Sequence, residues 1–239
     1  MVIDATKLEF KELNEKIRDT AEDVEITGCL GQRFIAAGLG RKKIKISGVP
    51  GNALGAYLNG AKIMVSGNAQ DAVGDTMNDG DIFIHGNIGD AAGYAMRGGR
   101  IFVEKDAGYR AGIHMKAYKE KRPTLVIGGT AGCFLGEYQA GGAIIVLGIN
   151  SGGKSIVGDF PCTGMHGGKL FIRGSAEGIE FPKQVTAHKA SEDEKKEIEE
   201  VLKDFCTAFE KDFKEIYSSD FTVILPDSKT PFKQMYVAN

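Results

Sequence analysis

A 19-residue repeat is the feature that most restricts how this chain can fold. The segments IKISG, IMVSG, IFIHG and IFVEK start at Ile44, Ile63, Ile82 and Ile101, so three successive intervals are 19 residues long. Weaker copies start at Val24, Thr124, Ile144 and Leu170, with insertions of a few residues after Ile101 and after Ile144. Eight copies cover about 24–175, and an array of this period is typical of a solenoid.

Each copy joins a short strand pattern to regularly spaced glycines. The first four residues of a copy follow the pattern apolar-x-apolar-x, with the period of two that is typical of a strand. A segment of the form G-x-x-G-x-x-x-G follows. The glycines that define the repeat are Gly48, Gly51, Gly55, Gly67, Gly74, Gly86, Gly89, Gly93, Gly108 and Gly112. Glycine makes up 33 of 239 residues, roughly twice the ordinary usage. We expect it at coil corners with positive φ and where neighbouring coils approach closely.

Strands 19 residues apart are too close for βαβ units, but a coil that stacks on itself places equivalent residues about 4.8 Å apart. The apolar columns are Ile44/Ile63/Ile82/Ile101, Ile46/Val65/Ile84/Val103 and Leu58/Met77/Met96/Met115. A further column, Lys62/Asp81/Arg100/Lys119, alternates in charge over its first three members. We therefore expect an all-β-dominated, right-handed, single-stranded parallel β-helix of about eight coils. The left-handed acyltransferase β-helix is the alternative, but its six-residue subperiod does not appear.

Segments that flank the repeat predict caps for the solenoid. Residues 1–23 form an N-terminal cap with a helix near 11–20, 24–180 form the β-helix, and 181–239 form a C-terminal helical extension. Ser191 and Glu194 form a capping box, and a helix is expected over about 192–217. Its apolar positions are Ile198, Val201, Leu202, Phe205, Phe209, Phe213 and Ile216. They would pack on the flank of the β-helix or on a partner subunit. Residues 221–226 read as a strand that Pro226 ends.

Composition excludes several classes of function. The formal net charge of −2 argues against a dedicated nucleic-acid or membrane-surface binder. No apolar run reaches the length of a membrane span, and the N-terminus does not resemble a signal peptide, so a cytoplasmic protein is expected. Cys29, Cys133, Cys162 and Cys206 lack the spacing of a zinc or iron–sulfur site, which favours free thiols.

The segment Gly148–Ser155 fits the phosphate-loop pattern GxxxxGK(S/T) and follows a strand. In that interpretation Lys154 would contact the terminal phosphates and Ser155 would contact magnesium. Such a loop must open a long helix, whereas Gly158 and Pro161 follow closely here. Gly148 is also the repeat glycine of its coil, so an architectural role is the alternative.

Asp71 and Asp90 share one column of the repeat, with Asn52 before them and Tyr109 after them. Two carboxylates one coil apart could bind a cation or carry out glycosidic acid–base chemistry. The alternative is that both side chains accept hydrogen bonds from turn amides.

Other candidate groups carry weaker signals. His85, His114, His166 and His188 fall in different columns without metal-ligand spacing, which favours solvated or core histidines. The insertion 116–123, KAYKEKRP, is basic and is expected to project as a loop. It would be either a solvated loop or a docking surface for an acidic partner.

A family resemblance rests on three features of this sequence. The run Gly31-Gln32-x-Phe34 resembles the opening of the GXGXG domain of glutamate synthase large subunits. The G-x-x-G-x-x-x-G copies and the closure Gly164-Met165-His166-Gly167-Gly168 are similar to that domain too. The chain also resembles the component of tungsten/molybdenum formylmethanofuran dehydrogenases that carries the same repeat. The resemblance covers about 24–180 and leaves 191–239 unmatched.

This resemblance implies a right-handed β-helix that acts as a non-catalytic scaffold subunit of a split glutamate-synthase-type oxidoreductase. Val2 stands where a glutaminase nucleophile would be, and no catalytic, cofactor-binding or metal-binding residue carries over. Flavin, iron–sulfur or molybdopterin groups would belong to partner subunits of the complex, and a homo-oligomer is possible. A formylmethanofuran dehydrogenase component, a stand-alone β-helix hydrolase or lyase using Asp71 and Asp90, and a nucleotide-binding protein using Lys154 are the alternatives.

Overall fold

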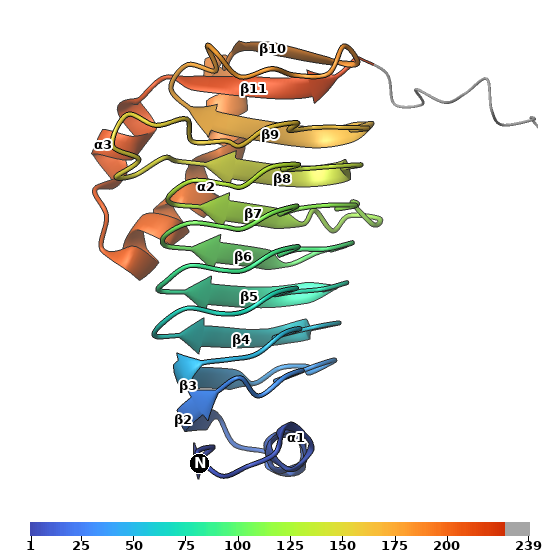
Figure 1. Ribbon diagram of the computed structural model, residues 1–239, viewed down its shortest axis with the longest axis vertical. Coiled ribbons are helices and arrows are strands. Elements are labelled where there is room, and N and C mark those ends of the chain that lie inside the picture. The colour runs from blue at the N-terminus through green and yellow to red at the C-terminus, as the bar shows by residue number, and fades with distance from the viewer. Residues whose placement is uncertain (228–239) are drawn as a thin grey trace, which may run out of the picture.

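A computed structural model describes residues 1–227 and shows a stack of parallel strands closed by a cap at each end (Figure 1). Residues 228–239, the end of the expected C-terminal extension, lie outside the described part. The elements are β1 (Val2–Asp4), α1 (Phe10–Asp19), β2 (Val24–Leu30), β3 (Lys43–Val49), β4 (Asn59–Val65), β5 (Asp79–Ile84), β6 (Arg100–Val103), β7 (Thr124–Ile127), β8 (Ala140–Val146), β9 (Gly167–Arg173), β10 (Val185–Lys189), α2 (Glu192–Phe209), α3 (Phe213–Ser218) and β11 (Phe221–Pro226).

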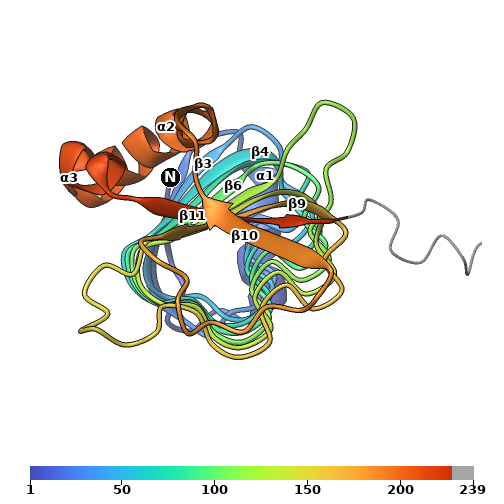
Figure 2. The same ribbon diagram turned by 90° about the horizontal axis from the view of Figure 1, so that it is seen from above.

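The predicted parallel β-helix is confirmed. Strands β1 to β9 pair in chain order and in parallel, and seen from above the coils lie over one another (Figure 2). Ile44 pairs with Ile63, Ile63 with Ile82 and Ile82 with Ile101, which is the register that the repeat predicts. The strand register corrects where one of the weaker copies begins. Thr124 pairs with Arg100, so Leu125 and not Thr124 continues the isoleucine column. A second strip of isolated parallel bridges joins Ala69, Ile88, Ala107, Ala131 and Val157 on another side of the coil.

Inward-facing columns fill the solenoid with apolar side chains. The three columns predicted from the sequence are buried throughout, and Ile26, Ile127, Val146 and Ile172 extend one of them. The column that contains Met115 continues at Gln139, which is also fully buried. Because one coil cannot bury its apolar side chains alone, stacking is what forms this core.

The coil corners correct one expectation about glycine. Gly74 has a φ of 69° as predicted, but the residues two positions before and after it, Ala72 and Thr76, are left-handed too. Left-handed alanine recurs at Ala53 and Ala91. A single non-glycine residue in this region is sterically disfavoured, so each corner stores some backbone strain that stacking must offset.

The N-terminal cap contains the predicted helix and an additional strand. Helix α1 buries Leu13 and Ile17 under the first coil. Strand β1 pairs in parallel with β2, although its three residues carry no repeat pattern. At the other end β11 pairs antiparallel with β9, and β10, which the sequence did not predict, pairs antiparallel with β11. Both ends of the core are therefore covered by cap elements.

Helix α2 lies along one outer flank of the solenoid (Figure 2), as the first of the two sequence alternatives predicted. Outward-facing Phe83, Phe102, Val126, Ile145 and Phe171 form one cluster with the apolar face of α2. The same outward position is Glu25 or Lys45 in the first coils, which the helix does not reach.

The sequence placed one long helix over 192–217, and this is wrong at its C-terminal part. The capping box at Ser191 and Glu194 is present, but α2 ends where Glu210 turns left-handed with a φ of 54°. Asp212 then caps the short helix α3 by accepting a hydrogen bond from Glu215 N. The break lets α3 turn back so that β11 can reach the top of the sheet.

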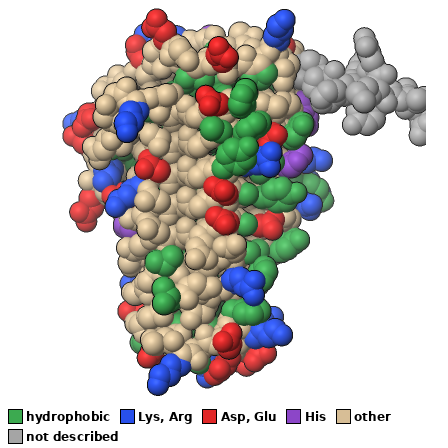
Figure 3. Space-filling model, in the orientation of Figure 1, with side chains coloured by type: hydrophobic (Ala, Val, Ile, Leu, Met, Phe, Trp, Pro, Cys, Tyr) green, Lys and Arg blue, Asp and Glu red, His purple; other side chains and the backbone are tan. Residues whose placement is uncertain are grey.

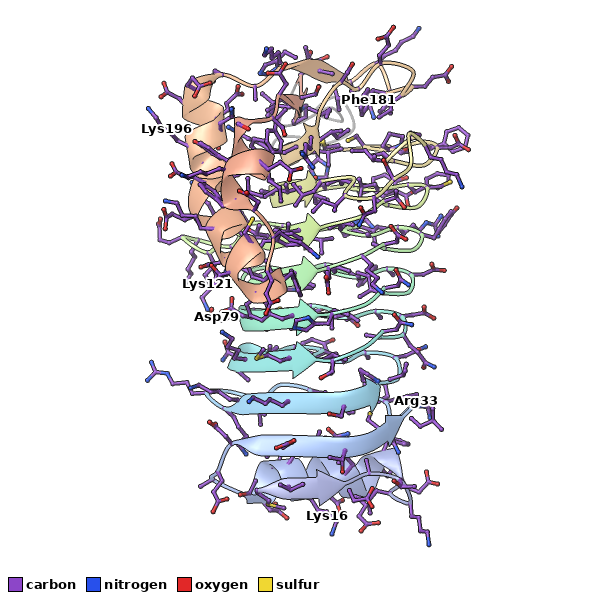
Figure 4. The ribbon with its side chains drawn as sticks, turned by 90° about the vertical axis from the view of Figure 1, so that its left-hand side faces the viewer. Lys16, Arg33, Asp79, Lys121, Phe181 and Lys196 are labelled. Carbon is purple, nitrogen blue, oxygen red and sulfur yellow. The ribbon has the colours of Figure 1, made fainter. Side chains whose placement is uncertain are left out.

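Ion pairs hold α2 against the stacked charges of the flank. Arg100 bonds both Asp81 in the coil below, at 2.7 Å and 3.0 Å, and Asp204 of α2. The alternation of charge between Lys62, Asp81 and Arg100 is confirmed, but Thr124, not Lys119, follows Arg100 in the column. Lys119 instead belongs to the projecting loop 116–123. In that loop Lys121 bonds Asp79 at 2.8 Å (Figure 4).

Candidate interaction surface

The column of Asp71 and Asp90 is a ladder of hydrogen bonds between coils. Asp90 N–H donates to Asp71 Oδ1 at 2.9 Å, and Tyr109 N–H donates to Asp90 Oδ1 at 2.8 Å. Asn52 Oδ1 accepts from Asp71 N in the same way at 3.3 Å. Each carboxylate therefore satisfies a backbone donor of the next coil, which is the amide-acceptor role considered from the sequence.

A second ladder, three positions earlier in each coil, was not predicted. Asn68 Oδ1 accepts from Asn87 N, Asn87 Oδ1 accepts from Asp106 N, and Asp106 Oδ1 accepts from Thr130 N, at 2.8 Å, 3.0 Å and 2.7 Å. The signal was present in the sequence, because Asn68, Asn87 and Asp106 are 19 residues apart.

Several repeat glycines make these ladders possible without adopting positive φ. A Cβ at Gly89 would collide with Asp71 Oδ1, and one at Gly108 would collide with Asp90 Oδ1. Where Gln70 replaces the glycine, the ladder bond above Asn52 is the longest of its column. The glycine before a ladder residue thus provides room for the acceptor from the coil below.

The loop Gly148–Ser155 projects from the solenoid between β8 and β9, and no helix lies between these strands. Gly148, Asn150, Gly152 and Gly153 have positive φ, and Ser155 Oγ donates to Val157 O at 2.7 Å. The element that would point backbone amides at a phosphate is therefore replaced by turns.

The histidines and cysteines are placed in different surroundings. His85 lies 3.6 Å from Glu104 and His188 lies 3.1 Å from Glu194, both at the docked helix. Burial raises the pKa of Cys29 to about 11 and that of Cys162 to about 12, so both thiols stay protonated at neutral pH. Within residues 1–227, no three His, Cys, Asp or Glu side chains are grouped to hold a metal ion.

The upper coils carry exposed aromatic side chains at a corner position that is Phe34 in the first coil and alanine in the three coils that follow. The left-handed positions of Ala53, Ala72 and Ala91 become Arg110, Phe134 and Phe160 in the following coils. The Phe134 ring packs between those of Tyr109 and Phe160 at centroid distances of 5.2 Å and 5.1 Å, tilted by 57° and 37°. Figure 3 shows hydrophobic side chains gathered along the right-hand part of this face. Bulky side chains at positive φ add strain and bury little, which is typical of a functional surface.

Beside these corners lies a surface that we name the basic–aromatic edge, made of six residues. Its members are Tyr94, Arg97, His114, Lys116, Tyr138 and His166. The His114 ring stacks on Tyr138 at 5.1 Å with an interplanar angle of 11°, and its edge meets Tyr94 at 6.0 Å. His114, Lys116, Tyr138 and His166 line an open hollow. The sequence placed His114 and His166 in separate columns, and the structure shows that those columns are neighbours.

Two buried polar side chains lie in the same coil as Tyr138. In the described part of the chain, Glu137 Oε2 and Gln139 Oε1 are the buried side-chain oxygens without a hydrogen bond. Arg110 Nε lies 2.9 Å from Glu137 Oε2, so the charge is paired although the angle is not that of a hydrogen bond. Gln139 Nε2 donates to Gly141 O and Gly142 O at 3.3 Å each. Buried polar groups that lack a hydrogen bond occur most often at functional sites. Here they lie next to the basic–aromatic edge.

Stacked coils and ladder side chains define this molecule as a parallel β-solenoid, and one of its edges exposes aromatic and basic side chains. The model of the GXGXG motif family matches residues 7–229, so the chain belongs to that family. The match extends beyond 24–180 on both sides and includes the helices α2 and α3. An uncharacterized protein of Methanocaldococcus jannaschii is 43 % identical over 250 residues, which cover 99 % of this chain and 96 % of that protein. The resemblance to the GXGXG superfamily stated from the sequence is thereby confirmed.

In residues 1–227, the structure contains no helix that is long and apolar enough to cross a membrane.

Proposed function

We propose that this chain is a non-catalytic structural subunit of a split glutamate-synthase-type oxidoreductase. The observation that carries the proposal is the family match, which spans 7–229 and thus nearly the whole chain. In such a complex these residues would supply the GXGXG unit, and partner subunits would bind the flavin or iron–sulfur groups.

Hydrogen bonding of the candidate acids supports this role. Asp71 and Asp90 each accept a backbone hydrogen bond from the next coil, and a carboxylate held in this way contributes to the stack. The exposed basic–aromatic edge supplies what a scaffold requires, a surface that can be buried against another protein.

Purification of the affinity-tagged chain from its native host tests the proposal. We expect stoichiometric recovery with proteins that carry flavin and iron–sulfur absorbance, together with glutamate synthase activity in the eluate. Recovery with molybdopterin-containing proteins would instead favour the formylmethanofuran dehydrogenase alternative. A chain that elutes alone and shows hydrolase or lyase activity, lost in Asp90→Asn, would contradict the proposal.

A further inference from the structure

The basic–aromatic edge contains a column of basic side chains. Arg97, Lys116 and His166 occupy equivalent positions of their coils, with Ala140 between the last two. Equivalent positions lie about 4.8 Å apart per coil. On the flank under α2, by contrast, Asp81 lies between Lys62 and Arg100 in their column and pairs with Arg100. Like charges in register repel one another, so the edge holds positive charge that the folded chain does not compensate.

No acidic side chain lines the hollow at this edge. Its described lining consists of His114, Lys116, Tyr138, Ala140, His166, Gly167 and Gly168. In residues 1–227, neither Arg97 nor Lys116 forms an ion pair with a carboxylate, and the nearby Glu137 is buried against Arg110. His166 Nδ1 lies 3.0 Å from Gly164 O and donates to it, which leaves Nε2 for another partner.

Aromatic side chains next to the charged column provide apolar area at little entropic cost. Tyr94 and Tyr138 are 41 % and 39 % exposed, and Tyr138 has a φ of 53°. Tyrosine and arginine side chains that lie together are typical of protein interfaces. Because Arg97 and Lys116 have no acidic partner within residues 1–227, a protein that binds at this edge must supply carboxylates.

We propose that the basic–aromatic edge binds an acidic segment of a partner subunit, an inference that rests on the proposed function. Carboxylates of that segment pair with Arg97, Lys116 and the protonated form of His166. Apolar side chains between those carboxylates pack on Tyr94 and Tyr138. Charge complementarity of this kind steers association and fixes the register of the two proteins.

Zero-length carbodiimide coupling of the native complex tests this contact directly. The reagent joins an amine to a carboxylate that is already within ion-pair distance, so we expect a cross-link from Lys116 to a Glu or Asp of a partner. Lys116→Arg keeps the charge but lacks the amine, and should lose that cross-link while the complex still forms. Coupling of other lysines of this chain to the partner, without any Lys116 product, would overturn the inference.

Charge reversal provides the second measurement. In the tagged chain, Arg97→Glu with Lys116→Glu should lower partner recovery about tenfold or more. Lys45→Glu, on the outer face of β3, should leave it unchanged. Both sites are exposed, so thermal unfolding of the variants should match the unaltered protein. Equal recovery for the edge variant and the unaltered chain would overturn the inference while the proposed function still holds.

If the unaltered chain is recovered alone, the proposed function fails. Binding of an acidic segment by the basic–aromatic edge is then tested in a separate experiment. The full chain is then titrated at low salt with a synthetic peptide of alternating glutamate and leucine. Saturable binding that the double edge variant weakens about tenfold supports an acid-binding edge. Absence of binding, or equal binding of a lysine–leucine peptide, would overturn it.

Discussion

Asp71 and Asp90 illustrate how single side chains join one coil to the next. Each presents Oδ1 to the backbone N–H of the residue 19 positions later. The repeat reveals the column, but it does not distinguish a carboxylate that accepts an amide from one that reacts. That distinction depends on side-chain direction, which the position of Gly89 and Gly108 in the close coil-to-coil approach determines.

Substitution of Asp90 should separate an acceptor role from a charge requirement. Asp90→Asn keeps Oδ1 as an acceptor, so we expect a free energy of unfolding close to that of the unaltered chain. Asp90→Ala leaves Tyr109 N–H without its acceptor and should cost about 1 kcal/mol. Urea unfolding measures both, and equal losses for Asn and Ala would contradict the ladder.

Replacement of Gly89 tests the room that the ladder needs. In Gly89→Ala the new Cβ meets Asp71 Oδ1, and we expect a destabilisation of about 1–3 kcal/mol from overpacking. In a chain that also carries Asp71→Ala, the oxygen is absent, so the cost of Gly89→Ala should be smaller. A double-mutant cycle from urea unfolding reports this coupling. Strict additivity of the two substitutions would show that the ladder oxygen is not what excludes a side chain.

At the scale of elements, the period predicted the strands because each outward or inward position repeats every 19 residues. The elements that were missed or misplaced lie where this pattern is absent. Strand β1 has three residues, and β10 is largely exposed and polar. The break at Glu210 depends on a left-handed backbone that a run of helix-forming residues does not reveal. Left-handed alanines at the corners likewise have no compositional signal.

Helix α2 should contribute to stability through its buried phenylalanines. Phe205 is fully buried, meets Phe209 at 4.9 Å, and lies where a side chain at Gly128 would be. Phe205→Ala should lower the free energy of unfolding by about 3–5 kcal/mol. Lys196→Ala, on the exposed side of the same helix (Figure 4), should change it by less than about 0.5 kcal/mol. Similar values for both variants in urea unfolding would show that α2 is not docked.

The N-terminus of α2 should give stability a specific dependence on pH. The backbone N–H of Ser191 is the main cause that lowers the pKa of Glu194 below 4.5, with the Ser191 hydroxyl and His188 adding to it. A carboxylate with a lowered pKa stabilises the folded state above its ordinary pKa, and this is lost as pH falls through the folded value. Glu194→Gln retains a capping amide. We therefore expect the stability advantage of Glu194 over Gln at pH 7 to shrink between about pH 5 and pH 3. A difference that is constant across this range would contradict the expectation.

At the scale of the whole molecule, the outer faces of the solenoid differ in charge and in the elements that cover them. One flank has alternating charge and is covered by α2, and both ends are capped by other elements. The basic–aromatic edge carries positive charge and exposed rings. The sequence indicated a basic insertion at 116–123, but Lys121 of that loop pairs internally with Asp79. Lys116, Arg97 and His166 are brought together only by the stacking of coils, so their column becomes visible once the register across the insertions is known.

We propose above all that the coils of this chain are structural and that partner subunits carry the chemistry. This proposal is tested most directly by the specific activity of the complex rebuilt with a chain carrying both Asp71→Asn and Asp90→Asn. These substitutions preserve the ladder acceptors but remove both carboxylates from their column. We predict that this complex assembles and turns over within about twofold of the complex with the unaltered chain, because no interaction with a transition state has been removed. Loss of activity by about a hundredfold or more in a fully assembled complex would contradict the account and assign the chemistry to this chain.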